Sequence, residues 1–137
     1  MHILAAEDDP TSREIIRRII TSEKRFTVVM ANDGLEAWNL LSESGSHFDA
    51  CFFDVMMPGL SAFDLLDRMR AHPKFMRTPV ILCTAAHDLP TVQLAKNHSV
   101  FGYLVKPCDR VAALEKLHRM ERVLEDEGRL PMQGCQI

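Results

Sequence analysis

The chain has 137 residues, which is enough for one domain with a hydrophobic core and too few for two domains of ordinary size. Hydrophobic residues make up 47% and charged residues 26% of the chain, and the formal net charge is −3. This profile is typical of a soluble globular protein and excludes a general attraction to nucleic acid or anionic membranes. No apolar stretch approaches the roughly 20 residues of a membrane span, and Met1 leads into a strand pattern without a signal peptide. We therefore expect a cytoplasmic protein with no membrane insertion.

Cysteines and histidines give no sign of a metal or disulfide framework. The four cysteines lack any CxxC spacing, and Cys51 and Cys83 lie inside strand-like runs. This placement favours buried structural thiols in a reducing cytosol over disulfides or metal ligands. The six histidines are scattered, with no pair at the spacing of zinc ligands.

Five short apolar runs alternate with helical patterns along the chain. Near-continuous apolar runs of this length are typical of strands buried on both faces, as in parallel sheets. Their alternation with helices indicates βα units with right-handed crossovers, and hence an α/β three-layer sandwich. The runs occupy residues 3–6, 27–30, 51–53, 80–83 and 102–105.

Local signals place the starts of the helices between these runs. Asp9 is predicted to cap a helix that begins at Pro10, a favoured position for proline. Ser61 is predicted to cap a helix that ends near residues 72–73. Further helices are expected to begin near Gly34, Pro90 (over about 90–98) and Asp109.

The predicted units fill most of the chain. We expect residues 1–127 to form one domain and residues 128–137 to form a short C-terminal tail. The sequence has no repeat and no low-complexity block.

Polar side chains follow four of the five runs. In open α/β sheets the ligand binds outside the carboxyl ends of the strands, so these side chains are predicted to converge. They are Glu7, Asp8 and Asp9 after the first run, Asp54 after the third, Thr84 after the fourth, and Lys106 with Pro107 after the fifth.

The chemistry of this set indicates phosphoryl transfer to an aspartate. The carboxylates of Asp8, Asp9 and Asp54 would repel one another unless a cation lay between them, and Mg²⁺ prefers such oxygen ligands. A carboxylate can also attack phosphorus and form an aspartyl phosphate. Thr84 would offer a hydroxyl, and Lys106 a positive charge, to the phosphoryl oxygens.

Each residue also has a simpler interpretation. Asp8 and Asp9 could serve solely to stabilise the positive end of the first helix. A threonine at a strand end and a single lysine are unremarkable alone. It is their joint occurrence at the ends of four runs that indicates a site.

The sequence resembles the receiver domain of bacterial two-component response regulators over roughly residues 1–127. The resemblance depends on several motifs in order rather than on any one of them. The motifs are Glu7-Asp8-Asp9, Asn32-Asp33-Gly34, residues 54–59 (Asp-Val-Met-Met-Pro-Gly), Thr84-Ala85 and Tyr103-Leu104-Val105-Lys106-Pro107.

The resemblance implies a flavodoxin-like (βα)5 doubly wound sheet with strand order 2-1-3-4-5. It implies that Asp54 is the phosphoacceptor and that Mg²⁺, with Mn²⁺ as an alternative, is held by Asp8, Asp9, Asp54 and the backbone carbonyl of Met56. Lys106 would pair with the phosphoryl group, and the Lys106-Pro107 peptide bond would be cis.

The resemblance also implies partners and a switch. A sensor histidine kinase or a histidine phosphotransfer protein would supply the phosphoryl group. Thr84 and Tyr103 would then turn toward the site and change the face formed by the fourth helix, fifth strand and fifth helix. That face would bind an unidentified downstream protein; a homodimer and a solvated surface fit its composition equally. Such a chain would catalyse only its own phosphorylation and dephosphorylation.

Two positions beside the site are predicted to control the lifetime of the aspartyl phosphate. Neither Met56 nor Ala86 can orient an attacking water by hydrogen bonding, so we expect slow self-dephosphorylation.

Other positions depart from the family pattern without removing a site residue. Ala62 and Ser99-Val100 replace common glycine-containing sequences, and Cys108 replaces a common aromatic residue and is expected to pack.

Two other functions compete with this interpretation. A phosphatase of the haloacid-dehalogenase type would need a second aspartate two residues after its nucleophile, but Met56 follows Asp54 and Pro10 follows Asp8 at that offset. A degenerate receiver would act as an interaction module independent of phosphorylation, although it would normally lack an acid, the hydroxyl or the lysine. Direct nucleic-acid binding would need a basic face or a known motif.

Overall fold

The computed structural model describes residues 1–90 and 99–130. Its centre is a five-stranded sheet in which every neighbouring pair is parallel. The strand order is β2-β1-β3-β4-β5, so the predicted order is confirmed. The strands are β1 (His2–Ala6), β2 (Thr27–Ala31), β3 (Ala50–Asp54), β4 (Val80–Thr84) and β5 (Gly102–Val105).

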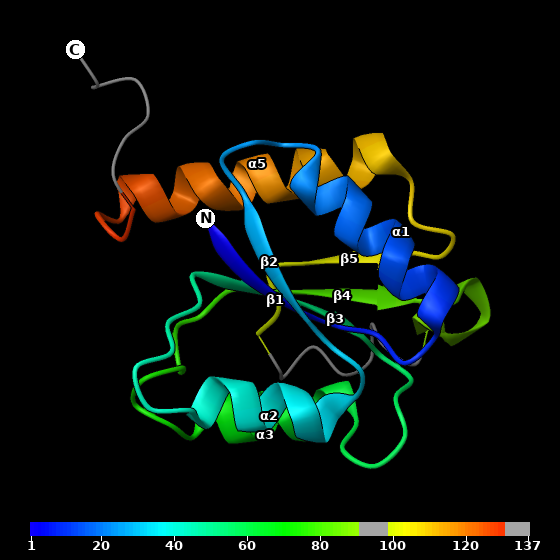
Figure 1. Ribbon diagram of the computed structural model, residues 1–137, viewed down its shortest axis with the longest axis horizontal. Coiled ribbons are helices and arrows are strands. Elements are labelled where there is room, and N and C mark those ends of the chain that lie inside the picture. Colours follow the sequence, from blue (N-terminus) through cyan, green and yellow to red (C-terminus); the bar gives the residue numbers. More distant parts are fainter. Residues whose placement is uncertain (91–98, 131–137) are drawn as a thin grey trace.

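Helices cover both faces of this sheet, as predicted for a three-layer sandwich. Helices α1 and α5 lie on one face, and α2 and α3 lie on the other (Figure 1). The helix predicted over about 90–98 falls almost wholly outside the described residues. The helices are α1 (Pro10–Thr21), α2 (Gly34–Ser42), α3 (Ala62–Arg70) and α5 (Arg110–Asp126), with a short 3-10 turn at Ala86–Asp88.

Side-chain caps fix where the helices begin. The Asp9 carboxylate accepts a hydrogen bond of 2.8 Å from the backbone N–H of Ser12, and Pro10 occupies the first turn of α1. The Ser61 hydroxyl accepts a bond of 3.2 Å from the N–H of Asp64 at the start of α3. Both caps agree with the sequence prediction, and the cap of α1 affects the site described below.

Two hydrophobic clusters hold the three layers together. One lies between the sheet and helices α2 and α3, and the other between the sheet and helices α1 and α5. Every residue of β3 and β4 is buried because both faces of the sheet are covered. The predicted burial of the Cys51 and Cys83 thiols is confirmed. Within residues 1–90 and 99–130, no helix has both the length and the apolar character needed to cross a membrane.

The structure places two of the residues that depart from the expected sequence pattern, Ala62 and Ser99. Ala62 is the first residue of α3 and is completely buried. Ser99 has a φ of 51°, in the left-handed region that glycine adopts at least cost. Its carbonyl accepts a hydrogen bond of 3.0 Å from Arg70 Nη2, which anchors this residue to α3.

The strand order creates a crevice at the carboxyl ends of β1 and β3. These strands are neighbours, but α1 leaves β1 toward one face and α3 leaves β3 toward the other (Figure 1). Ligands of open α/β sheets bind at such a switch point.

Candidate phosphorylation site

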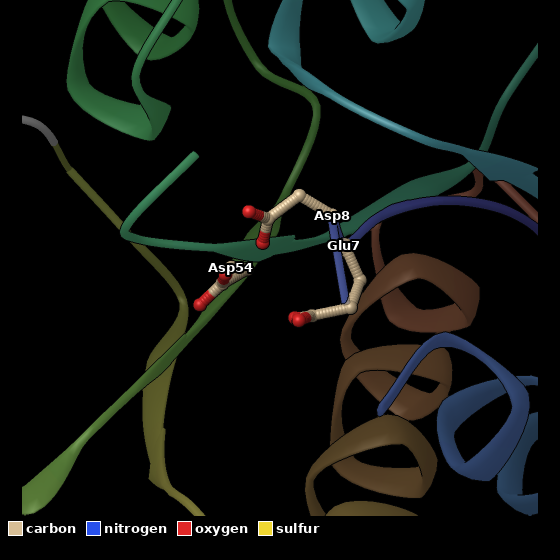
Figure 2. Close-up of side chains that lie close together, drawn as sticks. All are labelled: Glu7, Asp8 and Asp54. Carbon is tan, nitrogen blue, oxygen red and sulfur yellow. The ribbon is translucent and has the colours of Figure 1, made fainter. Parts of the chain in front are cut away.

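Three carboxylates gather at the carboxyl ends of β1 and β3. Glu7 directly follows β1, and its N–H donates a bond of 3.1 Å to the carbonyl of Ala31, at the end of β2. Asp54 is the last residue of β3. One oxygen each from Glu7, Asp8 and Asp54 lies within 4.8 Å of the others. Figure 2 shows these side chains converging from the two strand ends.

The cluster is buried on one side and open on the other. The side chain of Glu7 is completely buried and that of Asp54 is 5% exposed, whereas Asp8 is exposed. A cavity of about 380 Å³ opens beside them. Its lining consists of Glu7, Asp8, Asp9, Asp54, Met56, Ala85, His87, Asp88 and Lys106.

Lys106 is the cation that faces the buried acids. Its Nζ lies 3.0 Å from Asp54 Oδ1 and donates a hydrogen bond of 3.2 Å to Glu7 Oε1. The backbone N–H of Lys106 donates a bond of 2.7 Å to the carbonyl of Thr84, which places Lys106 just beyond the β4–β5 ladder. The Lys106-Pro107 peptide bond is cis.

One ammonium group does not compensate for this concentration of acids. Burial raises the pKa of Asp54, and the nearby Asp8 carboxylate raises it further, against the opposing effect of Lys106. Burial and the charge of Asp54 likewise raise the pKa of Glu7. Burial alone would lower the pKa of Lys106, but its bonds and charge interactions with Asp54 and Glu7 outweigh this and raise it. The site therefore favours an additional positive charge.

The donor set fits a hard divalent cation. Glu7 Oε2 is buried and has no hydrogen-bond partner among residues 1–90 and 99–130, although it lies 3.1 Å from Lys106 Nζ. An unsatisfied buried carboxylate oxygen is costly, and a cation would satisfy it. Glu7, Asp8 and Asp54 supply only oxygen ligands, which is the preference of Mg²⁺.

Asp9 lines the same cavity but is not among the three acids whose oxygens approach within 4.8 Å, and its predicted role as a metal ligand stays a prediction. Its carboxylate accepts the capping bond from Ser12, and this bond lowers the pKa of Asp9. The capping bond engages Oδ2 of Asp9. Of the three predicted acids, the structure brings together Asp8 and Asp54, and Glu7 joins them in place of Asp9.

The other predicted residues lie around the cluster. Thr84 ends β4, and its buried hydroxyl donates a weak bond of 3.3 Å to the carbonyl of Ala85. Tyr103 is half-buried and packs against the cluster shared with α2 and α3. Met56 lines the cavity with 65% of its side chain exposed. Ala86 lies in the 3-10 turn after β4, and its side chain is outside the described part of the chain.

Sequence reasoning missed three contributors to the site. His87 and Asp88 line the cavity from the 3-10 turn that follows Thr84. Arg13 Nη1 donates to the carbonyls of Glu7, at 3.1 Å, and Asp8, at 3.4 Å, and so fixes the turn between β1 and α1. A signal for His87 and Asp88 was present, since they follow the carboxyl end of a predicted strand.

Comparison with known proteins identifies the family. A sequence model described as "Response regulator receiver domain" matches residues 3–118. The chain belongs to the response regulator receiver family. It is 31% identical over 128 residues to a chemotaxis protein CheY homolog of Campylobacter jejuni, covering 93% of this chain and 98% of that protein. It is 32% identical over 120 residues to chemotaxis protein CheY-3 of Vibrio cholerae, covering 88% and 91%.

A much longer relative places the same domain in a different setting. The two-component response regulator-like protein PRR73 of rice is 28% identical over 107 residues, covering 78% of this chain. The chain spans only 14% of the length of PRR73. Shared receiver sequence therefore does not define what the rest of a protein does.

Solved structures agree with the fold. The receiver domain of AraT from Geobacillus stearothermophilus is 30% identical, with a TM-score of 0.80 and coverage of 93% of this chain and 97% of that chain. The receiver domain of the sensor histidine kinase PA1611 from Pseudomonas aeruginosa is 25% identical, with a TM-score of 0.74 and coverage of 87% of this chain and 95% of that chain. That domain has a magnesium ion coordinated in its active-site cleft.

Removing the charge of Asp54 is expected to stabilise the fold in the absence of divalent cations. Raised pKa values mean that Glu7 and Asp54 retain protons in the folded chain at pH values where the unfolded chain has lost them. Their contribution is therefore most favourable below the ordinary carboxyl pKa and declines as the pH rises through the folded pKa. In urea titrations at neutral pH, Asp54→Asn should have a higher free energy of unfolding than wild type, and the difference should shrink in acid. A variant that is less stable at neutral pH would contradict this account.

Asp8 and Asp9 are expected to differ in their effect on Mg²⁺ binding. Asp8→Asn should weaken binding, measured by titration calorimetry, by tenfold or more, since even outer partners of metal ligands typically contribute about 10- to 100-fold. Asp9→Asn should leave the affinity nearly unchanged, because asparagine caps a helix as well as aspartate does. An equal loss of Mg²⁺ affinity in the two variants would show that Asp9 takes part in metal binding as much as Asp8 does.

Proposed function

We propose that this receiver domain accepts a phosphoryl group on Asp54 in a Mg²⁺-dependent reaction with a phosphohistidine donor. The donor would be a sensor histidine kinase or a histidine phosphotransfer protein of the cytoplasm. The observation that carries the proposal is the contact of Asp54 with Lys106 inside a cluster of acids that favours a further cation. We also propose that residues 1–127 form the working unit and that residues 128–137 are a tail.

The reaction requires little covalent chemistry from the protein. An Asp54 carboxylate oxygen attacks the phosphorus atom, the bond between phosphorus and the histidine nitrogen breaks, and the imidazole leaves. Phosphoryl transfer depends mainly on positioning and on stabilising charge. Lys106 is already 3.0 Å from Asp54, so its ammonium is placed to pair with an oxygen of the incoming group.

The acids next to Asp54 account for the dependence on a metal. Glu7, Asp8 and Asp54, together with the backbone carbonyl of Met56, would hold Mg²⁺ as protein ligands, and Mn²⁺ would substitute for it. When bound, the ion would neutralise the negative charge shared by the carboxylates and the phosphoryl oxygens. The magnesium ion in the related PA1611 receiver supports this assignment.

Phosphorylation would act on the rest of the domain through Thr84. Its hydroxyl donates a weak bond of 3.3 Å to the carbonyl of Ala85, which a stronger bond to a phosphoryl oxygen would replace. Movement of Thr84 would leave space toward which Tyr103, on the neighbouring strand β5, could turn. Tyr103 lies two register positions from Thr84, since Leu82 pairs with Tyr103 and Thr84 pairs with Val105. The proposed output is a change in the surface around β5 and α5 that a downstream protein recognises.

Incubation with acetyl phosphate tests the central claim. In the presence of Mg²⁺ the intact mass of the wild type should increase by one phosphoryl group, and the adduct should be absent in Asp54→Asn and absent without Mg²⁺. Lack of any adduct, together with failure to bind Mg²⁺ or beryllofluoride, would overturn the proposal in favour of a degenerate interaction module. Beryllofluoride binding without an adduct would instead show that the phosphorylated form is lost too quickly to isolate.

Met56 provides a test of how long the phosphorylated state lasts. Its thioether lines the cavity but cannot orient a water molecule, so the amide of Met56→Asn should speed loss of the phosphoryl group several-fold. The decay of the adduct mass measures this rate. Met76→Asn is the matched control, because Met76 is 53% exposed and lies outside the lining of this cavity. An unchanged decay rate in Met56→Asn would contradict this role of Met56 in the lifetime. Ala86 is the second position predicted to affect the lifetime.

A further inference from the structure

Two cysteines meet beside the site, although they lie 25 residues apart in the chain. Cys83 is the second-last residue of β4 and precedes Thr84, and Cys108 follows the Lys106-Pro107 pair. Their Sγ atoms are 2.9 Å apart, and both thiols are free. Disulfide sulfurs are separated by about 2.05 Å, so an approach of roughly 1 Å would join these two.

The surroundings give the two sulfurs different roles. Cys83 is completely buried between the sheet and helices α1 and α5. Cys108 is half-buried and lines an open cavity of about 340 Å³ with Ser12, Ile15, Ile16, Lys106 and Pro107. A small solute can therefore reach Cys108 but not Cys83.

The electrostatic environment agrees with this division. The hydrogen bond with Cys83 lowers the pKa of the Cys108 thiol, and the nearby Lys106 ammonium acts in the same direction. The same interaction, together with burial, raises the pKa of Cys83. Because Cys108 lines the open cavity and Cys83 is completely buried, Cys108 is the sulfur that would react first with an external oxidant.

We propose that Cys83 and Cys108 are a reversible dithiol–disulfide pair. In the first step the Cys108 thiolate attacks one sulfur of a low-molecular-weight disulfide, such as oxidised glutathione, and releases one glutathione thiolate. In the second step the sulfur of Cys83 attacks the sulfur of Cys108, the bond between Cys108 and glutathione breaks, and the proton of the Cys83 thiol passes to the departing glutathione thiolate. Two protein thiols are oxidised to one disulfide, and one glutathione disulfide is reduced to two thiols.

The bond would connect the two strands that carry the phosphoryl-binding side chains. Cys83 adjoins Thr84, and Cys108 is two residues from Lys106, whose backbone N–H already binds the carbonyl of Thr84. A disulfide would oppose the adjustment of Thr84 and Lys106 toward a phosphoryl group. This consequence rests on the proposed function. It predicts that the oxidised protein is phosphorylated more slowly than the reduced protein.

Peptide mapping after equilibration with glutathione buffers tests the bond itself. A Cys135→Ser background removes the thiol that lies outside the described residues, and oxidised glutathione leaves exposed methionines such as Met56 unmodified. Oxidised samples, blocked with an alkylating agent and digested, should contain a linked Cys83–Cys108 peptide that a reducing thiol removes. Cys51→Ala, at a completely buried cysteine, should still form the link. Finding only a glutathione adduct on Cys108, or only links between molecules, would overturn the proposal.

The rate of phosphorylation by acetyl phosphate tests the consequence. Oxidation should slow adduct formation in the wild type, and reduction should restore it. Oxidation should have no effect in Cys108→Ser, whose fold is checked by circular dichroism. A linked wild type that reacts at an unchanged rate would overturn the coupling to the site. If the reduced protein accepts no phosphoryl group at all, the proposed function fails. Peptide mapping still decides whether the Cys83–Cys108 disulfide forms.

Discussion

The ion-pair cluster of Glu7, Asp54 and Lys106 is the constraint on which the rest of the site depends. Both acids are almost fully buried, and a single ammonium lies within about 3 Å of each of them. Burying a charge is costly unless it is paired, and here two buried carboxylates share one cation. The fold holds this unfavourable arrangement because the strands that carry it are anchored by two hydrophobic clusters. Excess negative charge therefore persists at the position where a cation and a phosphoryl group are needed.

The arrangement also depends on register between strands that are distant in sequence. Glu7 and Lys106 are 99 residues apart, yet they are in contact because β1 and β5 both end at the same edge of the sheet. The backbone bond from Lys106 to Thr84 aligns β5 with β4, and the bond from Val55 to Cys83 aligns β4 with β3. A shift in any of these pairs would move one member of the site away from the others. The parallel sheet thus acts as a scaffold that sets distances between side chains.

Much of this could be predicted from the sequence because the relevant signals are local. Apolar runs located the strands, and Asp54, Thr84 and Lys106 followed from their positions at strand ends. The choice among Glu7, Asp8 and Asp9 could not be made in the same way, because three consecutive acids look equivalent in a sequence. The capping role of Asp9 was nevertheless predictable, since an aspartate directly before Pro10 is a favoured helix cap. The order of the strands came from family resemblance, because periodicity does not say which strands are neighbours.

The contact between Cys83 and Cys108 could not be predicted in this way, because neither residue belongs to a local motif. It follows from the same register that builds the phosphorylation site. Thr84 pairs with Val105, so Lys106 must lie just past the end of β4, and the chain then turns back over Cys83. The cysteines and the phosphoryl-binding side chains therefore share one rigid corner of the sheet. A covalent change at either sulfur is one or two residues of backbone from Thr84 and Lys106, and Cys83 is also the β4 partner of Asp54 in the sheet.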